Sequence, residues 1–274
     1  MPMHKEDILA AVDLLAFDVD GTLVDDDQVL SPRTAAAIKK AQAMGKLVTL
    51  ATGKIYPSIE VLIAPLELQA PLVLANGAAI QDTRGNVLEQ EAVALDIIQF
   101  VMKHYKSDGL DMAIFNHDSI YVLEENYNTA HIDGFGEKVT AIGDWKNVEG
   151  KLDHVCKLFL INRKDPSKVH ELCDFLMQEL GERITISSGA PVSIEVMMKG
   201  VTKANGLRKL CALKGIPLER VMAFGDQKND LEMVDMAGVS VAVGNAIPEV
   251  KDIADFVIGT NNDHGVATFL EEIL

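Results

Sequence analysis

The chain has 274 residues, of which 48% are hydrophobic and 24% are charged, a balance typical of globular proteins and long enough for one large domain or two smaller ones. Its formal net charge of −16 argues against binding to nucleic acid or to an anionic membrane surface, because clustered lysine and arginine side chains bind both. No apolar run approaches the ~18 residues of a membrane-spanning helix, and charged residues interrupt the N-terminal segment, so we expect a cytoplasmic protein without a secretory signal.

The N-terminal third alternates short β-like runs with amphipathic stretches, a pattern typical of a parallel sheet covered by helices. Strands are expected at residues 12–17, 46–52 and 71–75. One helix is expected to begin after Ser31, which can cap it, with Pro32 at its first position, and to end at Gly45. A second helix is expected at 57–66.

The middle of the chain has a different pattern. A hairpin is expected to turn at Arg84-Gly85-Asn86. Beyond it, short strands are expected at 111–116, 119–125, 154–162, 183–188 and 192–197, with helices at 95–105 and 166–180. The antiparallel patterning of this block sets it apart from both flanks.

The alternation of helices and strands then resumes towards the C-terminus. Helices are expected at 202–213 and 231–236, and strands at 220–224 and 239–243. The simplest organisation is an α/β fold, with a Rossmann-like parallel-sheet core built from both ends of the chain and an inserted α+β domain. We expect residues 1–82 and 191–274 to form the core and residues 83–190 to form the insertion.

Two acids directly follow the first expected strand, in the stretch FDVDGTLV. Because strand side chains alternate, Asp18 and Asp20 point the same way. Two carboxylates at such a short distance repel each other unless a cation or a hydrogen bond compensates the repulsion. A polar loop in which Asp20-Gly21 makes a turn is the alternative interpretation.

Polar residues also follow other expected strands. Thr52-Gly53 ends the second strand, Asp226 to Asp230 follow a late one, and Lys203 lies at a helix start. Ligands of open α/β sheets bind outside the carboxyl ends of the strands, so we expect these clusters to converge.

Together these groups suit phosphoryl transfer. One carboxylate can attack phosphorus and form an aspartyl-phosphate, while a second acid protonates the leaving oxygen and then activates water. The Thr52 hydroxyl and the Gly53 N–H can hold phosphoryl oxygens, and Lys203 can neutralise nucleophile and phosphate. Asp226, with Asp230 or Asn229 one turn further on, can complete a site for Mg²⁺, which prefers carboxylates, waters and a substrate phosphate.

The motifs FDVDGTLV, TLATGK, VTKANGL and AFGDQKNDLEM, in that order, resemble those of haloacid dehalogenase (HAD) superfamily phosphatases of the Cof type. The stretch AVGNAIPEVKDIADFVIGTNNDHGVA is similar to that family's C-terminal signature. The resemblance covers nearly the whole chain and is weakest in the inserted block, which in that family is an α/β cap of type IIB that closes over the substrate. It implies Mg²⁺-dependent hydrolysis of a small phosphorylated metabolite, most commonly a sugar phosphate.

The resemblance also implies a role for each matching residue. Asp18 is the nucleophile and a metal ligand, and Asp20 is the general acid/base whose backbone carbonyl also binds the metal. The other residues it assigns are the metal ligand Asp226, the phosphate-binding Thr52, Gly53 and Lys203, and the supporting Asn229 and Asp230. Relatives that are not phosphoester hydrolases tend to replace the second acid, so Asp20 favours the phosphatase branch.

One position departs from the family pattern. The second motif usually reads ATGR, whereas here it reads ATGK. Lys54 keeps the positive charge but lacks the planar fork of arginine, which bears on how the leaving group or the cap is held. The alternative for Lys54 is a solvated lysine. Asn76-Gly77 is expected near the substrate, with a tight turn as the alternative.

The cysteines point away from a disulfide framework or a zinc site. Cys156, Cys173 and Cys211 are far apart in the sequence and form no CxxC pair. We expect small core residues in a reducing compartment.

Three functional interpretations stay open. The first is a phosphatase, the second a phosphotransferase or mutase of the same superfamily, and the third a phosphate-ligand sensor without turnover. FMN, pyridoxal phosphate and hexose phosphates fit the pattern alike, both Mg²⁺ and Mn²⁺ accept oxygen ligands, and no oligomeric state is predicted.

Overall fold

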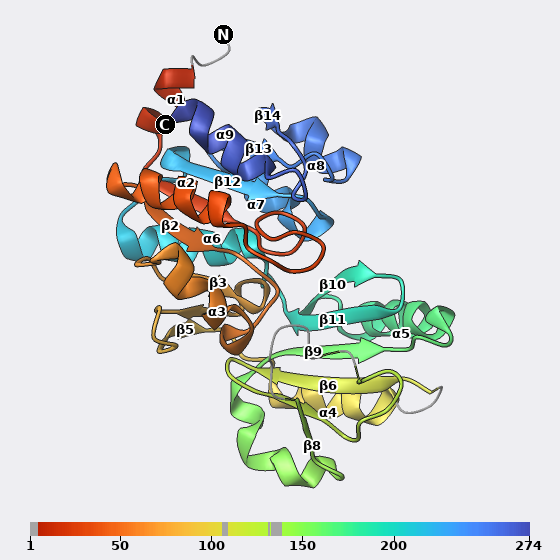
Figure 1. The fold of residues 1–274 in the computed structure, drawn as a ribbon. Coiled ribbons are helices and arrows are strands. Elements are labelled where there is room, and N and C mark those ends of the chain that lie inside the picture. The colour runs from red at the N-terminus through yellow and green to blue at the C-terminus, as the bar shows by residue number, and fades with distance from the viewer. Residues whose placement is uncertain (1–4, 106–108, 131, 133–138) are drawn as a thin grey trace.

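The computed structural model describes residues 5–105, 109–130, 132 and 139–274. Figure 1 shows two parts, one built from both ends of the chain and one built from its middle. The expected α/β fold with a parallel-sheet core and an additional, largely antiparallel sheet is confirmed. Among the helices in the described part of the chain, none combines the length and the apolar character needed to cross a bilayer.

A five-stranded parallel sheet forms the centre of the first part, in the order β14-β13-β12-β1-β2. Its strands are β1 (Leu14–Phe17), β2 (Leu47–Leu50), β12 (Val221–Gly225), β13 (Val239–Ala242) and β14 (Phe256–Val257). The helices of this part are α1 (Lys5–Ala11), α2 (Pro32–Ala43), α3 (Tyr56–Leu66), α6 (Lys203–Lys214), α7 (Leu231–Asp235), α8 (Pro248–Ile253) and α9 (Gly265–Ile273). Short 3-10 helices cover Ala75–Gly77, Leu218–Arg220 and Lys228–Asp230.

Helices cover both faces of this sheet, which explains the continuous apolar run of β1. Leu15 and Phe17 point into a hydrophobic cluster shared with α2 and α9. Leu14 and Ala16 point into a second cluster shared with α6. All four residues are fully buried, so the strand is anchored on both faces and holds the residue that follows it in a fixed place.

The third expected strand does not simply extend the parallel sheet. β3 (Leu72–Leu74) is linked to the end of β2 by a single parallel bridge between Ala51 and Val73. Its other partner is β4 (Ala79–Gln81), which pairs in turn with β5 (Val87–Gln90), both antiparallel. The hairpin expected at residues 84–86 is therefore confirmed, and it joins β4 to β5.

The middle of the chain forms a six-stranded sheet in the order β10-β11-β9-β6-β7-β8. Its strands are β6 (Asp111–Asn116), β7 (Ile120–Val122), β8 (Val139–Ala141), β9 (Val155–Ile161), β10 (Ile184–Ala190) and β11 (Ser193–Met198). Neighbouring strands are antiparallel except β7 and β8. The helices are α4 (Leu95–His104), α5 (Pro166–Leu180) and a 3-10 segment, Trp145–His154.

The two faces of this six-stranded sheet have different roles. Helices α4 and α5 pack on one face and form its hydrophobic core. From the other face, Phe115, Cys156 and Met197 pack with Ile55 and Ala75 of the first part. This second face is therefore turned towards the loops at the carboxyl ends of the core strands (Figure 1).

The strand pairings bear on where the inserted domain begins and ends. The expected boundary after residue 82 falls inside the β4–β5 hairpin, and the one after residue 190 falls inside the β10–β11 hairpin. Since β11 also pairs with β9, we propose that the inserted domain runs from about residue 91 to about residue 200.

Candidate active site

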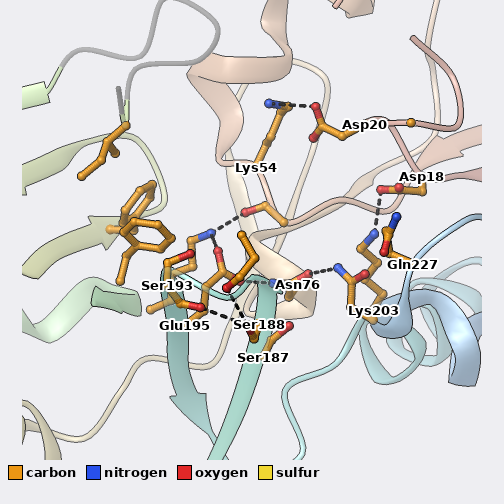
Figure 2. Close-up of a pocket in the computed structure, with 18 of the residues that line it drawn as sticks. Asp18, Asp20, Lys54, Asn76, Ser187, Ser188, Ser193, Glu195, Lys203 and Gln227 are labelled. Carbon is orange, nitrogen blue, oxygen red and sulfur yellow. Dashed lines mark hydrogen bonds and ion pairs between the residues drawn. The ribbon is translucent and has the colours of Figure 1, made fainter. Parts of the chain in front are cut away.

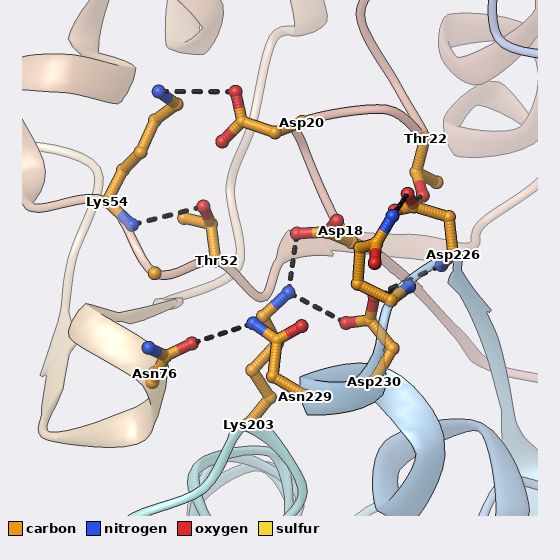
Figure 3. A network of polar contacts seen from close by, with 12 residues as sticks. Asp18, Asp20, Thr22, Thr52, Lys54, Asn76, Lys203, Asp226, Asn229 and Asp230 are labelled. Carbon is orange, nitrogen blue, oxygen red and sulfur yellow. Dashed lines mark hydrogen bonds and ion pairs between the residues drawn. The ribbon is translucent and has the colours of Figure 1, made fainter. Parts of the chain in front are cut away.

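The carboxyl ends of three core strands bring the expected polar residues together. Asp18 follows β1, Thr52 follows β2, and Asp226 follows β12. Lys203 begins α6, which Thr202 caps by accepting a hydrogen bond from the Asn205 N–H. Figure 3 shows that the side chains of Asp18, Thr52, Lys203 and Asp226 lie around one centre.

Lys203 is the fixed cation of this centre. Its side chain is 2% exposed, and its Nζ donates to Asp18 Oδ1 at 2.6 Å and to Asp230 Oδ1 at 2.7 Å. Burial opposes its charge, but the carboxylates of Asp18 and Asp230 outweigh burial and raise the pKa of Lys203 above its usual value. The lysine therefore stays charged and holds one carboxylate oxygen of Asp18 in place.

Asp230 supports the centre from behind. Its Oδ2 accepts hydrogen bonds from the backbone N–H groups of Asp226 and Gln227, both at 3.0 Å. With Lys203 on its other oxygen, Asp230 is fully engaged and fixes the loop that carries Asp226. The Asp226 carboxylate is itself held by the Thr22 hydroxyl and the Gln227 amide, each at 3.0 Å.

The centre holds more negative than positive charge. Burial first, and then the charge of Asp230, raise the pKa of Asp18 well above its usual range, with Lys203 acting against them. Burial and Asp230 likewise raise the pKa of Asp226. Three buried carboxylates thus share one ammonium group, and a bound cation would relieve the imbalance.

The donor set fits a hard divalent cation. Ligand oxygens of Asp18, Asp226 and Asp230 all lie within 4.8 Å of one another. Asp230 accepts three hydrogen bonds, one of them from the Lys203 ammonium group, whereas each oxygen of Asp226 accepts one from an uncharged side chain. The residues that would hold the ion are therefore Asp18 and Asp226. The Asp20 side chain lies outside this group and instead pairs with Lys54 Nζ at 3.2 Å. The metal role expected for Asp20 concerns its backbone carbonyl and is compatible with this ion pair.

The loop after β2 is also fixed. Thr52 is fully buried, its N–H donates to the Val73 carbonyl at 2.9 Å, and its hydroxyl oxygen accepts from the Lys54 N–H at 3.2 Å. This contact uses the hydroxyl as an acceptor and leaves its hydrogen available as a donor, but Thr52 itself is not among the residues that line the pocket. Gly53 lines the pocket beside it.

Asn76 and Gly77 differ in their positions. Asn76, with a left-handed backbone (φ 56°), lines the pocket, donates to Glu195 Oε2 and accepts from Asn229 Nδ2 at 3.1 Å. Gly77 is not among the pocket-lining residues, and a Cβ added to it would lie 2.2 Å from the Thr202 carbonyl oxygen. Gly77 thus lets the chain pass close to the start of α6.

A pocket of about 530 Å³ lies between this centre and the six-stranded sheet (Figure 2). Sequence analysis missed most of the residues on its far wall. These are Phe115, Ile132, Lys157, Phe159, Arg163, Ser187, Ser188 and Ser193. The one available signal was Lys157, a lysine inside the apolar strand VCKLFLI, where a charge needs a partner.

Comparisons with known proteins show the family and the fold of this chain. The family of haloacid dehalogenase-like hydrolases matches residues 15–270. The chain is 30% identical over 267 residues to the 5-amino-6-(5-phospho-D-ribitylamino)uracil phosphatase YcsE of Bacillus subtilis, covering 97% of both chains. It is 30% identical to the HMP-PP phosphatase of Serratia proteamaculans, covering 95% of both. A crystal structure of a haloacid dehalogenase-like hydrolase from Bacteroides thetaiotaomicron superposes with a TM-score of 0.87 at 24% identity, over 96% of this chain and all of that one, which shows the shared fold.

Proposed function

This chain belongs to the haloacid dehalogenase-like hydrolase family, and we propose that it is a phosphatase that releases phosphate from a small phosphorylated metabolite. The observation that carries the proposal is Lys203, which holds Asp18 at the base of a pocket lined by Gly53 and closed by the six-stranded sheet. The two relatives are named for different phosphorylated substrates and do not single out one class. Sugar phosphates, which the sequence motifs imply, are the class we propose to test first.

Asp18 is the proposed nucleophile. One of its carboxylate oxygens forms a bond to phosphorus, and the bond between phosphorus and the leaving oxygen breaks. Lys203 holds the other oxygen and offsets the negative charge of the attacking group. The Thr52 hydroxyl and the Gly53 N–H are the proposed donors to the phosphoryl oxygens.

Asp20 is the proposed general acid and base. It gives its proton to the leaving oxygen, which departs as an alcohol, and later takes a proton from the water that attacks the aspartyl-phosphate. That second attack breaks the bond to Asp18 and releases inorganic phosphate. The exposed position of Asp20 beside the pocket suits both transfers, since its side chain is 44% exposed.

Mg²⁺ is the proposed cofactor, with Asp18 and Asp226 as its side-chain ligands. When bound, it would neutralise the phosphoryl group and the excess carboxylate charge. Asn229 and Asp230 are the proposed supporting residues at its edge.

Phosphate release from a panel of sugar, nucleotide and cofactor phosphates, with Mg²⁺ and with EDTA, tests this function. Metal-dependent release by the wild-type chain, abolished in Asp18→Asn, is expected. Release that survives in Asp18→Asn would contradict the nucleophile assignment. Transfer of phosphate to a sugar in place of water would identify a phosphotransferase, and binding without turnover a sensor.

A further inference from the structure

We propose that Lys157 and Glu195, which lie on two strands of the six-stranded sheet, are positioning residues that hold the phosphate-binding loop 52–54 in its working geometry. The inference rests on the proposed phosphatase function. It concerns residues of the inserted domain, which the family motifs quoted above do not include.

Lys157 reaches from β9 to the core. Its side chain is 5% exposed, and its Nζ donates to the Gly53 carbonyl oxygen at 2.8 Å. The same Nζ donates to Glu195 Oε1 on β11, so the cation is neutralised within the inserted domain. A buried lysine thereby fixes the peptide group that follows Gly53.

Glu195 extends this contact to a second core loop. Its other carboxylate oxygen accepts from the Asn76 amide, and the Asn76 carbonyl oxygen accepts from Asn229 at 3.1 Å. The Asn76 N–H also donates to the Thr52 carbonyl at 2.9 Å. Figure 2 shows Glu195 and Asn76 side by side below the pocket.

Two contacts hold the phosphate-binding loop, and the Glu195 carboxylate links them. Lys157 binds the Gly53 carbonyl, while the Asn76 amide packs against Gly53, where an added Cβ would meet both amide atoms at 3.3 Å. Within the loop, the Lys54 N–H donates to the Thr52 hydroxyl oxygen at 3.2 Å. The loop geometry thus depends on two side chains from the other domain.

Stability alone gives a weak reason for this pair. Burying two charges costs desolvation energy, and apolar residues of similar size are often as stabilising. The same face of the sheet already packs on the core through Phe115, Cys156 and Met197. A charged pair that binds a backbone carbonyl and a side-chain amide instead fixes the orientation of those two groups. Phosphoryl transfer requires such fixed orientation of the groups that hold the phosphate.

The test compares Lys157→Met and Glu195→Gln with wild type, using the best substrate of the panel and acetyl phosphate, whose leaving group is small. We expect kcat to fall about 10- to 100-fold for both substrates, because a misplaced loop affects the transfer itself. The double variant should lose about as much as either single variant, since the pair acts as a unit. Hydrogen exchange at the amides of residues 52–54 should be faster in both.

Lys168→Met is the matched control, because Lys168 is a half-buried lysine of the same domain that lies away from the loop and pairs with Glu171 on α5. It should keep wild-type kcat. Lys157→Arg, which keeps a donor and a charge, should recover part of the activity lost in Lys157→Met. If Lys157→Met does not fold, Glu195→Gln, which keeps the size of the side chain, decides by the same comparison.

Unchanged kcat in a folded Lys157→Met or Glu195→Gln variant would overturn the inference. A rise in KM for the larger substrate alone, with acetyl phosphate unaffected, would also overturn it, by making these residues substrate contacts. A wild-type chain that releases no phosphate would instead contradict the proposed function, and hydrogen exchange would then test the loop contact by itself.

Discussion

The ammonium group of Lys54 lies 3.2 Å from Asp20 Oδ1, and this ion pair joins the loop after β2 to the loop after β1 (Figure 3). The side chain of Lys54 is only 15% exposed, so the solvated lysine considered as an alternative does not describe it. The lysine at the family's usual arginine position therefore contacts the proposed general acid and base.

Replacing Lys54 should affect turnover. In Lys54→Met, Asp20 loses the cation that orients it, and we expect kcat to fall about tenfold. Lys54→Arg should stay close to wild type, because arginine can make the same ion pair. Steady-state kinetics measure both. Lys39→Met serves as the control, since Lys39 pairs with Glu67 on the core surface, and a tenfold loss there would discredit the interpretation.

Mg²⁺ should stabilise the folded chain even without substrate. A cation bound by Asp18 and Asp226 offsets the excess buried carboxylate charge, and saturating Mg²⁺ should raise the melting temperature by about 5 °C. In Asp226→Asn the shift should be much smaller. Asp27→Asn, which changes an exposed acid of the loop after β1, should keep the full shift, as measured by scanning calorimetry. An equal shift in wild type and Asp226→Asn would rule out this metal site.

Gly77→Ala should destabilise the fold strongly. Its φ of +93° is strained for alanine, and the new Cβ would lie 2.2 Å from the Thr202 carbonyl. We expect the free energy of unfolding to fall by about 2–4 kcal/mol. Gly45 has a φ of +86°, but a Cβ added there would have no atom within 4 Å, so Gly45→Ala should cost only about 1 kcal/mol. Urea unfolding of the two variants separates the steric contact from the backbone strain, and equal losses would contradict the contact.

Thiol reactivity should follow burial. Burial raises the pKa of Cys156 to about 12 and that of Cys211 to about 11, so both stay protonated in the folded chain at pH 8. Iodoacetamide should modify the partly exposed Cys173 first and reach the other two only in urea, as read by mass spectrometry. The two buried thiols stay protonated up to a higher pH in the folded state than in the unfolded state. The contribution of these thiols to the free energy of unfolding should therefore decline as the pH rises from about 9 to 12. Rapid labelling of native Cys156 would be inconsistent with its position.

Much of the candidate site could be predicted because it depends on one rule of parallel sheets. Asp18, Thr52 and Asp226 each follow a strand, and the carboxyl ends of parallel strands meet at one edge. The structure brings these residues and Lys203 together as that rule requires. Their roles in catalysis stay predictions.

Other features depend on contacts that no local pattern encodes. The link from Lys157 to Gly53 and from Glu195 to Asn76 exists because one face of the inserted sheet packs on the core. The helix α1 was missed because its short segment, KEDILAA, carries three charges and too few apolar positions to show a period. β3 pairs antiparallel with β4, which follows it closely in the sequence, and the residues of β3 alone do not predict this pairing.

The order of strands in the core has a consequence for synthesis of the protein. β1 lies between β2, which follows it closely in sequence, and β12, whose Val221 pairs with Leu14. Leu14 and Val221 are about 200 residues apart, which a ribosome adding roughly 5–20 residues per second covers in about 10–40 s. Throughout that interval one edge of β1 has no strand partner and can pair with other chains. A chain released before β12 is made has Asp18, Thr52 and Lys203, but it has neither this partner strand of β1 nor Asp226.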